Sequence, residues 1–513
     1  MSGSIHTGDQ IGQDLLLKPD VCVVGSGPGG AMIASRLSRA GASVVVLEEG
    51  GHYSKESFDM QEGTAYPSLY QDRGNRATAD LSISIMQGRA VGGGTVVNWT
   101  TSFRTPDDVV EHWREHSGAG FSPAVLAPHF EEIERRLNIE KVQLEDANAN
   151  NRSLYDGCKK QGWQVDTTRR NVRGCLRTGY CGMGCPVDAK QSAALTYLPD
   201  ALGAGAELYA NCRVEKIEWS GRRATAAVGR VLVPGTSLET GRTIRVEPRI
   251  LVVSGGALNS PALLLRSGLD QGPVGKKTWL HPVVALVALY PERIEGFYGA
   301  PQSVASHHFA HRSGGAGFFL EAAPVHPMLA GLAFPGFGPG LRTNMSELAY
   351  AAVSLALMID GFHASENGGT VSLRPDGGPK VDYPLEARHI ECLRSGMKAL
   401  ARAHLGNGAL VAVTGHTAPV SLRSESDLAL IDAAPLGPNR CGVFTAHQMG
   451  GCRFGTDPSQ SVVNPQLRHH LIENLFVCDG SVFPTSLGVN PMESIYGITS
   501  WAADHVHAAL AKA

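Results

Sequence analysis

A glycine-rich turn near the start of the chain, GSGPGG at residues 25–30, constrains the fold more than any other feature. The apolar run Val21–Val24 before it predicts a buried parallel strand, and the apolar spacing from Ala31 to Ala40 predicts a helix. The glycines therefore lie at a strand-to-helix turn, where Gly25 permits the bend, Gly27 admits a pyrophosphate and Gly30 lets the helix pack closely. This pattern predicts a Rossmann-like, dinucleotide-binding α/β fold.

An acidic residue follows this turn at a spacing typical of dinucleotide-binding folds. A second strand, Ser43 to Leu47, ends at Glu48, which comes eighteen residues after Gly30. At a spacing of about 20 residues a carboxylate bonds the ribose hydroxyls of the dinucleotide and repels a 2′-phosphate. Glu48 therefore argues against a phosphorylated nicotinamide cofactor. The turn alone does not separate FAD from NAD, so a nicotinamide dehydrogenase remains one alternative.

Composition limits the classes of partner. With 513 residues the chain exceeds the ~250–300 at which single cores usually divide, so two domains are expected. Its 45 basic and 48 acidic residues give a net charge of −3, which offers no electrostatic footprint for nucleic acid. We recognise neither a signal peptide nor a membrane-spanning run, and the ten cysteines are scattered. The sequence therefore predicts a cytoplasmic protein with free thiols that acts on a small molecule.

Three of the cysteines form a cluster. Cys175, Cys181 and Cys185 lie within eleven residues in the segment GCLRTGYCGMGC, and three thiolates at such spacing can hold an iron–sulfur cluster. A structural zinc site lacks its usual paired cysteines and histidine partner here. The other interpretation is a glycine-rich loop with buried thiols and no metal, which is the one we favour. An electron-transfer subunit with an iron–sulfur cluster remains an alternative.

The middle of the chain has a different pattern. Val283 to Tyr290 and Tyr350 to Ile359 are apolar runs separated by Gly/Pro-rich loops, which predicts an inserted sheet domain. FPGFGPGL at residues 334–341 is expected to be a loop, either a lid or a surface turn. Before this region, Arg249 to Val253 predicts a strand that leads into a helix at Asn259, with Ser260 as its cap.

The C-terminal part carries candidate catalytic residues. Leu475 to Cys478 predicts a strand, Asp479-Gly480-Ser481 a turn, and Ile498 to Leu510 a closing helix. Oxidation of a C–OH group by hydride transfer needs one group that accepts the hydroxyl proton and another that fixes the oxygen. His447 is the candidate base, because histidine titrates near neutral pH, and Asn490 is the candidate hydrogen-bond donor.

Five motifs in this order resemble the glucose–methanol–choline (GMC) flavin oxidoreductases. They are GSGPGG with Glu48, GRAVGGGTVVN at residues 88–98, SGGALNSPALLLRSG at 254–268, HQMGGC at 447–452 and DGSVFPTSLGVNP at 479–491. The resemblance implies oxidation of an alcohol by FAD, with His447 and Asn490 as the catalytic pair beside flavin N5. The residues that it implies for the cofactor are Gly25, Gly27, Gly30, Glu48, Gly92, Gly93, Gly94, Thr95, Asn98, Val214, Asp479 and Gly480.

The resemblance also implies a domain layout and a mode of FAD attachment. Residues 1–105, 186–280 and 436–513 are expected to form a discontinuous FAD-binding domain. An interleaved antiparallel-sheet substrate domain would take residues 106–185 and 281–435. Asn98 stands where some relatives place the histidine that joins FAD covalently, so non-covalent FAD is expected.

Substrate and acceptor are less defined by the motifs. GRAVGGGTVVN and DGSVFPTSLGVNP are similar to cholesterol-oxidase-type members, whereas CGMGCPVDAKQS is similar to long-chain alcohol oxidases. A primary, hydrophobic or aromatic alcohol is the expected substrate. Oxygen, a quinone or a carrier protein would reoxidise the flavin. A non-oxidative lyase or decarboxylase of the same fold is the remaining alternative.

Overall fold

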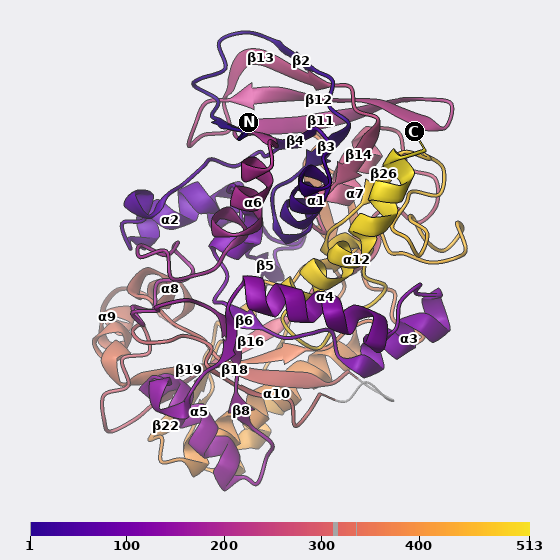
Figure 1. Cartoon of the computed structure of the whole chain (residues 1–513). Coiled ribbons are helices and arrows are strands. Elements are labelled where there is room, and N and C mark those ends of the chain that lie inside the picture. The colour runs from indigo at the N-terminus through magenta and orange to yellow at the C-terminus, as the bar shows by residue number, and fades with distance from the viewer. Residues whose placement is uncertain (1, 311–315, 335, 513) are drawn as a thin grey trace.

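The computed structural model describes residues 2–310, 316–334 and 336–512. Its upper part in Figure 1 is built on a parallel sheet, and its lower part on a large antiparallel sheet. The chain crosses between the two parts several times. The fold is thus the mixed α/β architecture that the sequence predicts.

A six-stranded parallel sheet forms the nucleotide-binding half. Its order is β1, β10, β4, β3, β14, β26, and all neighbours are parallel. The central strands are almost wholly apolar and buried, as a sheet covered on both faces requires. The bounds are β1 Ile5–His6, β10 Glu207–Tyr209, β4 Val44–Leu47, β3 Val21–Val24, β14 Ile250–Val253 and β26 Leu475–Val477.

Helices from distant parts of the chain cover this sheet. Helix α1 (Pro28–Arg39) follows β3 and packs against α6 (Tyr197–Gly203) and α12 (Met492–Leu510), the latter of which also contacts α4 (Pro123–Arg136). The strand, turn and helix expected at residues 21–40 are therefore confirmed. Helix α12 begins six residues earlier than the sequence predicts, because a buried apolar face continues back to Met492.

A nine-stranded sheet forms the other half. Its main path runs β23, β22, β16, β19, β18, β17, β8, with β24 beside β16 and β5 beside β24. Strands β16 and β19, which the sequence predicts, are antiparallel neighbours. The bounds are β5 Ile83–Ile85, β8 Asp166–Thr167, β16 Val283–Leu289, β17 Val304–Ser306, β18 Phe318–Ala322, β19 Ala351–Met358, β22 Val411–Thr414, β23 Ser421–Leu422 and β24 Val443–Thr445.

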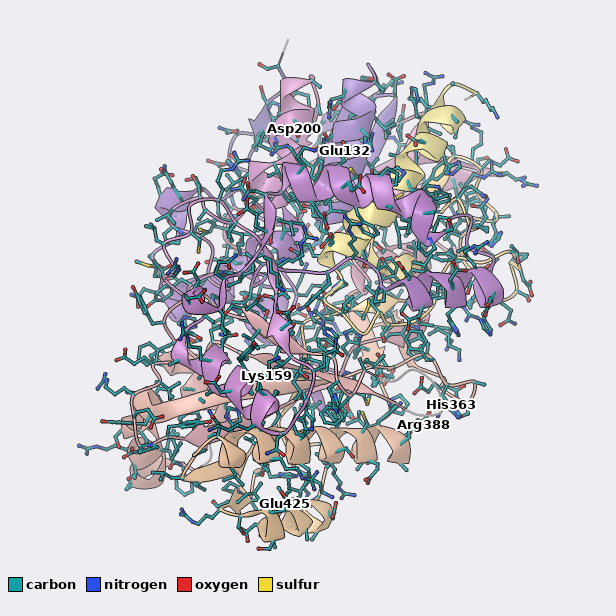
Figure 2. All side chains as sticks on the ribbon, turned by 60° about the horizontal axis from the view of Figure 1, so that its bottom comes forward. Glu132, Lys159, Asp200, His363, Arg388 and Glu425 are labelled. Atoms are coloured by element: carbon teal, nitrogen blue, oxygen red, sulfur yellow. The ribbon has the colours of Figure 1, made fainter. Side chains whose placement is uncertain are left out.

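One face of this sheet is covered by helices and the other faces the interior of the molecule. Helix α10 (Ala387–Gly406) and helix α5 (Ala149–Lys160) lie along the outer face. In Figure 2, Lys159 lies at the end of α5 and Arg388 at the start of α10. On the opposite face, α8 (Pro327–Ala333) and α9 (Gly338–Ser346) cover one part, and the rest forms one wall of a cavity between the two halves.

Smaller sheets complete the structure, and the first of them lies at the top of Figure 1, beyond the parallel sheet. They comprise β11 (Cys212–Ser220), β12 (Arg223–Leu232), β13 (Glu239–Val246) and β2 (Leu15–Leu17); β21 (Pro379–Asp382), β20 (Gly369–Leu373), β15 (Lys276–Trp279) and β25 (Met449–Gly450); and β6 (Thr101–Ser102), β9 (Arg169–Asn171) and β7 (Ile139–Lys141). The remaining α-helices are α2 Glu62–Leu69, α3 Asp107–Ser117, α7 Asn259–Arg266, α8 Pro327–Ala333, α9 Gly338–Ser346 and α11 Ala429–Ala433.

Two local predictions are corrected. Helix α9 begins at Gly338, so the second half of FPGFGPGL is helical rather than a loop, and Pro335 lies outside the described residues. Helix α7 starts at Asn259 as predicted, but Ser260 is not its cap: the residue before the helix is Leu258, and the Ser260 hydroxyl donates to Asp479 instead. The domain boundaries at residues 105, 185, 280 and 435 stay a prediction.

Candidate active site

One cavity of about 800 Å³ lies between the two halves and collects nearly all the predicted site residues. A volume of this size is at the upper end for ligand sites and suits a large cofactor. Every residue predicted to be catalytic or to bind the cofactor lines it except Gly30 and Gly92. Gly30 is needed for packing instead, since a Cβ there would come within 2.0 Å of the Gly25 carbonyl oxygen.

The glycine turn after β3 shapes one end of this cavity. Gly25 has φ +102°, a conformation that glycine adopts without strain. Gly27 precedes α1 without a side-chain cap, so the first N–H groups of the helix are available to an anion. Gly93 faces this turn so closely that a Cβ would come within 2.7 Å of the Gly27 Cα. These features fit a pyrophosphate that lies against bare backbone.

Glu48 is fixed by donors of the same turn. Its carboxylate accepts hydrogen bonds from the Ser26 N–H (2.9 Å), the Ser26 hydroxyl (2.6 Å) and the Gly50 N–H (2.8 Å). Burial raises the pKa of Glu48, and these hydrogen bonds oppose that effect. The side chain lines the cavity eighteen residues after Gly30, where the sequence predicts a ribose contact.

Asp479 ties three segments together beside the cavity. It accepts from the N–H groups of Gly256 and Ser481, both at 2.8 Å, and from the Ser260 hydroxyl at 2.5 Å. Burial raises its pKa. Asp479 therefore holds the Gly255-Gly256 loop in place. Gly255 and Gly256 line the cavity, and the site prediction omitted them although it recognised the motif that contains them.

The loop from Gly92 to Asn98 runs along the cavity. Gly93, Gly94, Thr95 and Asn98 line it, and a Cβ at Gly94 would meet nothing within 4 Å, so there is open space beside the backbone there. The buried ammonium of Lys190 holds this loop from behind, because it donates to the carbonyl oxygens of Val96 and Asn98. The loop is thus anchored by Lys190 and presents bare backbone to the cavity at Gly93 and Gly94.

His447 and Asn490 meet at the other end of the cavity. Nδ2 of Asn490 lies 3.3 Å from Nε2 of His447, and both side chains line the cavity. Burial lowers the pKa of His447 to about 4, so its ring is neutral at pH 7. The expectation that this histidine titrates near neutral pH is therefore corrected. Beside the pair the wall is apolar, formed by Val283, Leu355, Leu357 and Phe444.

His281 lies behind His447 and was not predicted. Its Nδ1 is 3.2 Å from Nδ1 of His447, and its Nε2 accepts from the Gly488 N–H at 3.0 Å. The ring is fully buried, and the residue has φ +44°, in the left-handed region. The segment Leu280-His281-Pro282 carries no motif by which the sequence reveals this role.

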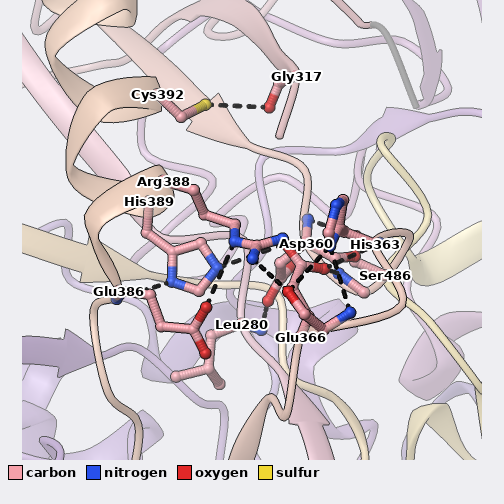
Figure 3. A network of polar contacts seen from close by, with 12 residues as sticks. Leu280, Gly317, Asp360, His363, Glu366, Glu386, Arg388, His389, Cys392 and Ser486 are labelled. Carbon is pink, nitrogen blue, oxygen red and sulfur yellow. Dashed lines mark hydrogen bonds and ion pairs between the residues drawn. The ribbon is translucent and has the colours of Figure 1, made fainter. Parts of the chain in front are cut away.

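A buried carboxylate supports this segment (Figure 3). Asp360 accepts from the N–H groups of Leu280 (3.0 Å) and His281 (3.3 Å) and from the Tyr383 hydroxyl (2.5 Å). Its carbonyl oxygen accepts from the Ser486 hydroxyl at 2.6 Å. Asp360 therefore links the His281 segment to the loop that carries Asn490.

The cysteine segment lies apart from the catalytic pair. Cys175, Cys181 and Cys185 are free thiols, and each accepts a hydrogen bond from a different donor: the Arg177 N–H, the Arg170 guanidinium and the Lys190 N–H. Among the residues that the structure describes, no group of three or more His, Cys, Asp or Glu side chains could hold a metal ion. The three cysteines line one small cavity together, and the iron–sulfur alternative stays a prediction.

Comparison with family models identifies the chain. A model described as GMC oxidoreductase matches residues 66–283 and a second one residues 365–499, while an FAD binding domain model matches residues 18–57.

The chain belongs to the GMC oxidoreductase family.

Relatives extend over most of the chain. An uncharacterized GMC-type oxidoreductase of Mycobacterium tuberculosis is 34% identical over 496 residues, which cover 95% of this chain and 75% of the relative. A long-chain-alcohol oxidase of Arabidopsis thaliana is 31% identical over 505 residues, or 93% of this chain and 67% of the relative. The resemblance that the motifs indicated is thereby confirmed.

Solved structures share the fold. Pyridoxine 4-oxidase from Mesorbium loti superposes with a TM-score of 0.71 at 18% identity and covers 95% of this chain and 99% of its own. A formate oxidase from Aspergillus oryzae gives 0.72 at 15% identity, with 97% and 99% covered. As a GMC member the chain is an FAD-dependent oxidoreductase that acts on CH–OH groups, and the nicotinamide alternative is set aside.

None of the helices in the described ranges has the length and apolar character needed to cross a bilayer. The cytoplasmic location stays a prediction.

Proposed function

We propose that this protein oxidises a primary, hydrophobic or aromatic alcohol to its aldehyde, with a ketone as the product of any secondary alcohol. The observation that carries the proposal is the pairing of His447 and Asn490 at 3.3 Å, next to an apolar wall, at one end of a cavity whose other end suits a dinucleotide. The apolar wall and the likeness to long-chain-alcohol oxidases support an apolar substrate.

The two side chains divide the work on the alcohol oxygen. Asn490 donates from Nδ2 and fixes the oxygen, while Nε2 of the neutral His447 accepts the hydroxyl proton. FAD, when bound, supplies the hydride acceptor at N5 of its flavin. The apolar wall excludes water, so the hydrogen bonds to the oxygen act in a low dielectric.

One observation favours a second role for His447. The Gly488 N–H donates to Nε2 of His281, so a neutral His281 carries its proton on Nδ1 and donates it to Nδ1 of His447. A neutral His447 then keeps its own proton on Nε2 and only hydrogen-bonds the alcohol oxygen as a donor, so in this role the hydroxyl proton would pass to water instead of to His447. A His281→Phe variant separates the two roles of His447. If His447 acts as a base, the variant should retain or gain kcat/KM when the His281 donor is lost. If His447 acts as a hydrogen-bond donor, the variant should lose kcat/KM.

The test of the main proposal is anaerobic mixing of the yellow protein with primary, aromatic, sterol and sugar alcohols. We expect an apolar primary or aromatic alcohol to bleach the flavin band, and His447→Ala to slow this step by roughly 10²-fold to 10⁴-fold. His507→Ala, on the exposed side of α12, is the matched control. Full-rate bleaching in His447→Ala would refute the assignment of His447.

The same experiment decides the class of reaction. Rapid recovery of the flavin band in air marks an oxidase, and recovery only with a quinone or carrier protein marks a dehydrogenase. A flavin that dithionite reduces but that no alcohol of the panel reduces would favour the lyase or decarboxylase alternative.

We also propose that FAD is held without a covalent bond. The residue at the position of the linking histidine of some relatives is Asn98, whose Nδ2 contacts Sδ of Met492 at 3.0 Å. An amide nitrogen is not a nucleophile comparable to imidazole, since its lone pair is delocalised. Acid precipitation should therefore leave all the yellow colour in the supernatant.

A further inference from the structure

Arg76 is a buried arginine that lines the cavity and takes no part in the proposed catalysis. Its Nε donates to Oδ2 of Asp72 at 2.8 Å. Nη1 donates to Oε1 of Gln87 at 2.7 Å and to Oδ1 of Asn259 at 3.1 Å, and Nη2 donates to Oε1 of Gln71 at 3.3 Å. We refer to Gln71, Gln87 and Asn259 as the amide cluster. One guanidinium group thus contacts three amide side chains of the cavity wall.

The amide cluster has a fixed orientation. A guanidinium group can only donate hydrogen bonds, so each amide must turn its carbonyl oxygen toward Arg76 and its NH₂ group away from it. Within the described part of the chain, these NH₂ groups have no hydrogen-bond acceptor, and all three residues line the cavity. The cluster therefore offers the cavity donors alone, and a bound ligand would have to supply the acceptors.

Gln87 places the cluster beside the glycine turn. Its Nε2 lies 3.1 Å from the position that a Cβ on Gly256 would take. The loop of Gly256 borders the turn, because a Cβ on Gly25 would come within 3.1 Å of the backbone of that loop. On its other side Gln87 precedes Gly88, where a Cβ would come within 2.9 Å of the Gly93 carbonyl oxygen. Since Gly93 itself packs against the turn, the cluster belongs to the end of the cavity that suits a pyrophosphate.

We propose that the amide cluster, oriented by Arg76, is a donor site for the pyrophosphate of FAD, the cofactor of this family. The free N–H groups at the start of α1 provide one set of donors, and the cluster provides a second set from another part of the wall. Pyrophosphate oxygens accept hydrogen bonds, so they match a site that holds only donors. Arg76 is a positioning residue, because it acts on the pyrophosphate through the amides. The inference concerns the cofactor and goes beyond the proposed function.

Arginines compensate the acids of this wall. Asp72 pairs with Arg76 and also lies 3.8 Å from Arg374 of the β20–β21 hairpin, while Asp376 pairs with Arg374 at 3.1 Å. Asp72 and Arg73 have φ of 49° and 59°, both in the left-handed region. Such strain persists where surrounding contacts impose it, and the ion pair of Asp72 with Arg76 is such a contact. The network thus holds the segment that carries Gln71 in a defined conformation.

The principal test is Gln87→Glu in the holoenzyme. The new carboxylate still accepts from Arg76, but it presents a second oxygen where the NH₂ group was. FAD release after dilution, followed by the rise in flavin fluorescence, should become roughly 10-fold to 100-fold faster, as expected when a hydrogen bond to a charged group is lost. Gln13→Glu adds the same charge at an exposed residue outside the cavity lining and should release FAD at the wild-type rate. Equal release rates in Gln87→Glu and Gln13→Glu would overturn the proposal.

Variants of Arg76 test its positioning role. Arg76→Met leaves the amides free to turn their carbonyl oxygens into the cavity, so it should also speed FAD release. Arg76→Lys should restore the wild-type rate only in part, because an ammonium group has three donors for four partners. An Arg76→Met protein that holds FAD as tightly as the wild type refutes the positioning role. Where Arg76→Met does not fold, Gln87→Glu decides alone.

Phosphorus NMR of the holoenzyme shows which part of FAD the cluster contacts. The phosphorus resonances of bound FAD should shift in Gln87→Glu relative to the wild type and to Gln13→Glu, while the flavin absorption bands keep their positions. Shifted flavin bands with unchanged phosphorus resonances would overturn the pyrophosphate assignment. Neither measurement involves turnover, so a failure to oxidise any alcohol would refute the proposed function and leave this inference standing.

Discussion

Nδ2 of Asn490 and Nε2 of His447 lie 3.3 Å apart although 43 positions separate them in the chain. His447 follows β24, and Asn490 precedes α12, so two halves of the fold must meet to form the pair. His447 also has a buried neighbour behind it, because its Nδ1 lies 3.2 Å from Nδ1 of His281. The geometry of the pair therefore depends on both sheets.

The pKa of His447 gives the first prediction. A base must be neutral, and burial lowers the pKa of His447 to about 4, so the protonated fraction becomes appreciable only near that pH. We expect kcat/KM for the alcohol to fall as the pH drops through about 4, rather than through the 6.5 of an ordinary histidine. Initial rates across the acid range, with flavin content measured at each pH, check this; an acid limb near 6.5 would contradict it.

The second prediction concerns the cofactor loop. A Cβ at Gly94 would meet no protein atom within 4 Å, yet this residue lines the cavity. Gly94→Ala should therefore leave the folded apoprotein as stable as the wild type and weaken FAD binding, because the methyl group occupies space expected for the flavin. Gly63→Ala on α2, also without a close neighbour, is the control. Fluorescence titration with FAD and thermal unfolding of the apoproteins distinguish the two effects, and equal FAD affinity in both variants would argue against flavin beside Gly94.

The third prediction tests the support of the His281 segment. Asp360→Asn replaces one accepting oxygen with a donor, so it cannot accept from Leu280, His281 and Tyr383 together. We expect a loss of about 1–3 kcal/mol in the free energy of unfolding and a lower kcat, since His281 and the Ser486 loop would both shift. Urea unfolding and steady-state rates check this. Asp382→Asn, on the exposed side of β21, should change neither quantity.

Local periodicity made the nucleotide-binding half predictable. The strand Val21–Val24 and the helix after GSGPGG are specified by residues close together in sequence, and a glycine is required at Gly25 by its positive φ. The family motifs predicted that His447 and Asn490 form a pair, and both side chains line one cavity in the structure. Each motif marks a backbone turn that this fold keeps.

The second layer of the site was not predictable in this way. His281 lies in an ordinary apolar run, and the bend at its positive φ brings it to the catalytic pair. The pKa of His447 depends on burial that the sequence does not state. Ser260 looked like a helix cap because Asn-Ser-Pro often starts helices, but the buried Asp479 competes for its hydroxyl.

The last prediction concerns the stability that depends on Glu321, a fully buried acid on β18. Its pKa is about 8 in the folded protein and 4.5 ordinarily, so the folded state holds a proton that the unfolded state loses between these values. The stability that this group contributes is therefore fully present below pH 4.5 and is lost as the pH rises to about 8. Since each pH unit corresponds to about 1.4 kcal/mol, the loss is at most about 5 kcal/mol.

Glu321→Gln has no such proton to lose. It should unfold at the same temperature as the wild type near pH 4 and at a higher temperature than the wild type above pH 8, whereas Asp382→Asn should follow the wild type throughout. Thermal unfolding of the FAD-free proteins across this range measures the difference. A constant difference between Glu321→Gln and the wild type at all pH values would show that Glu321 has the same charge in the folded and unfolded states, which would contradict the raised pKa.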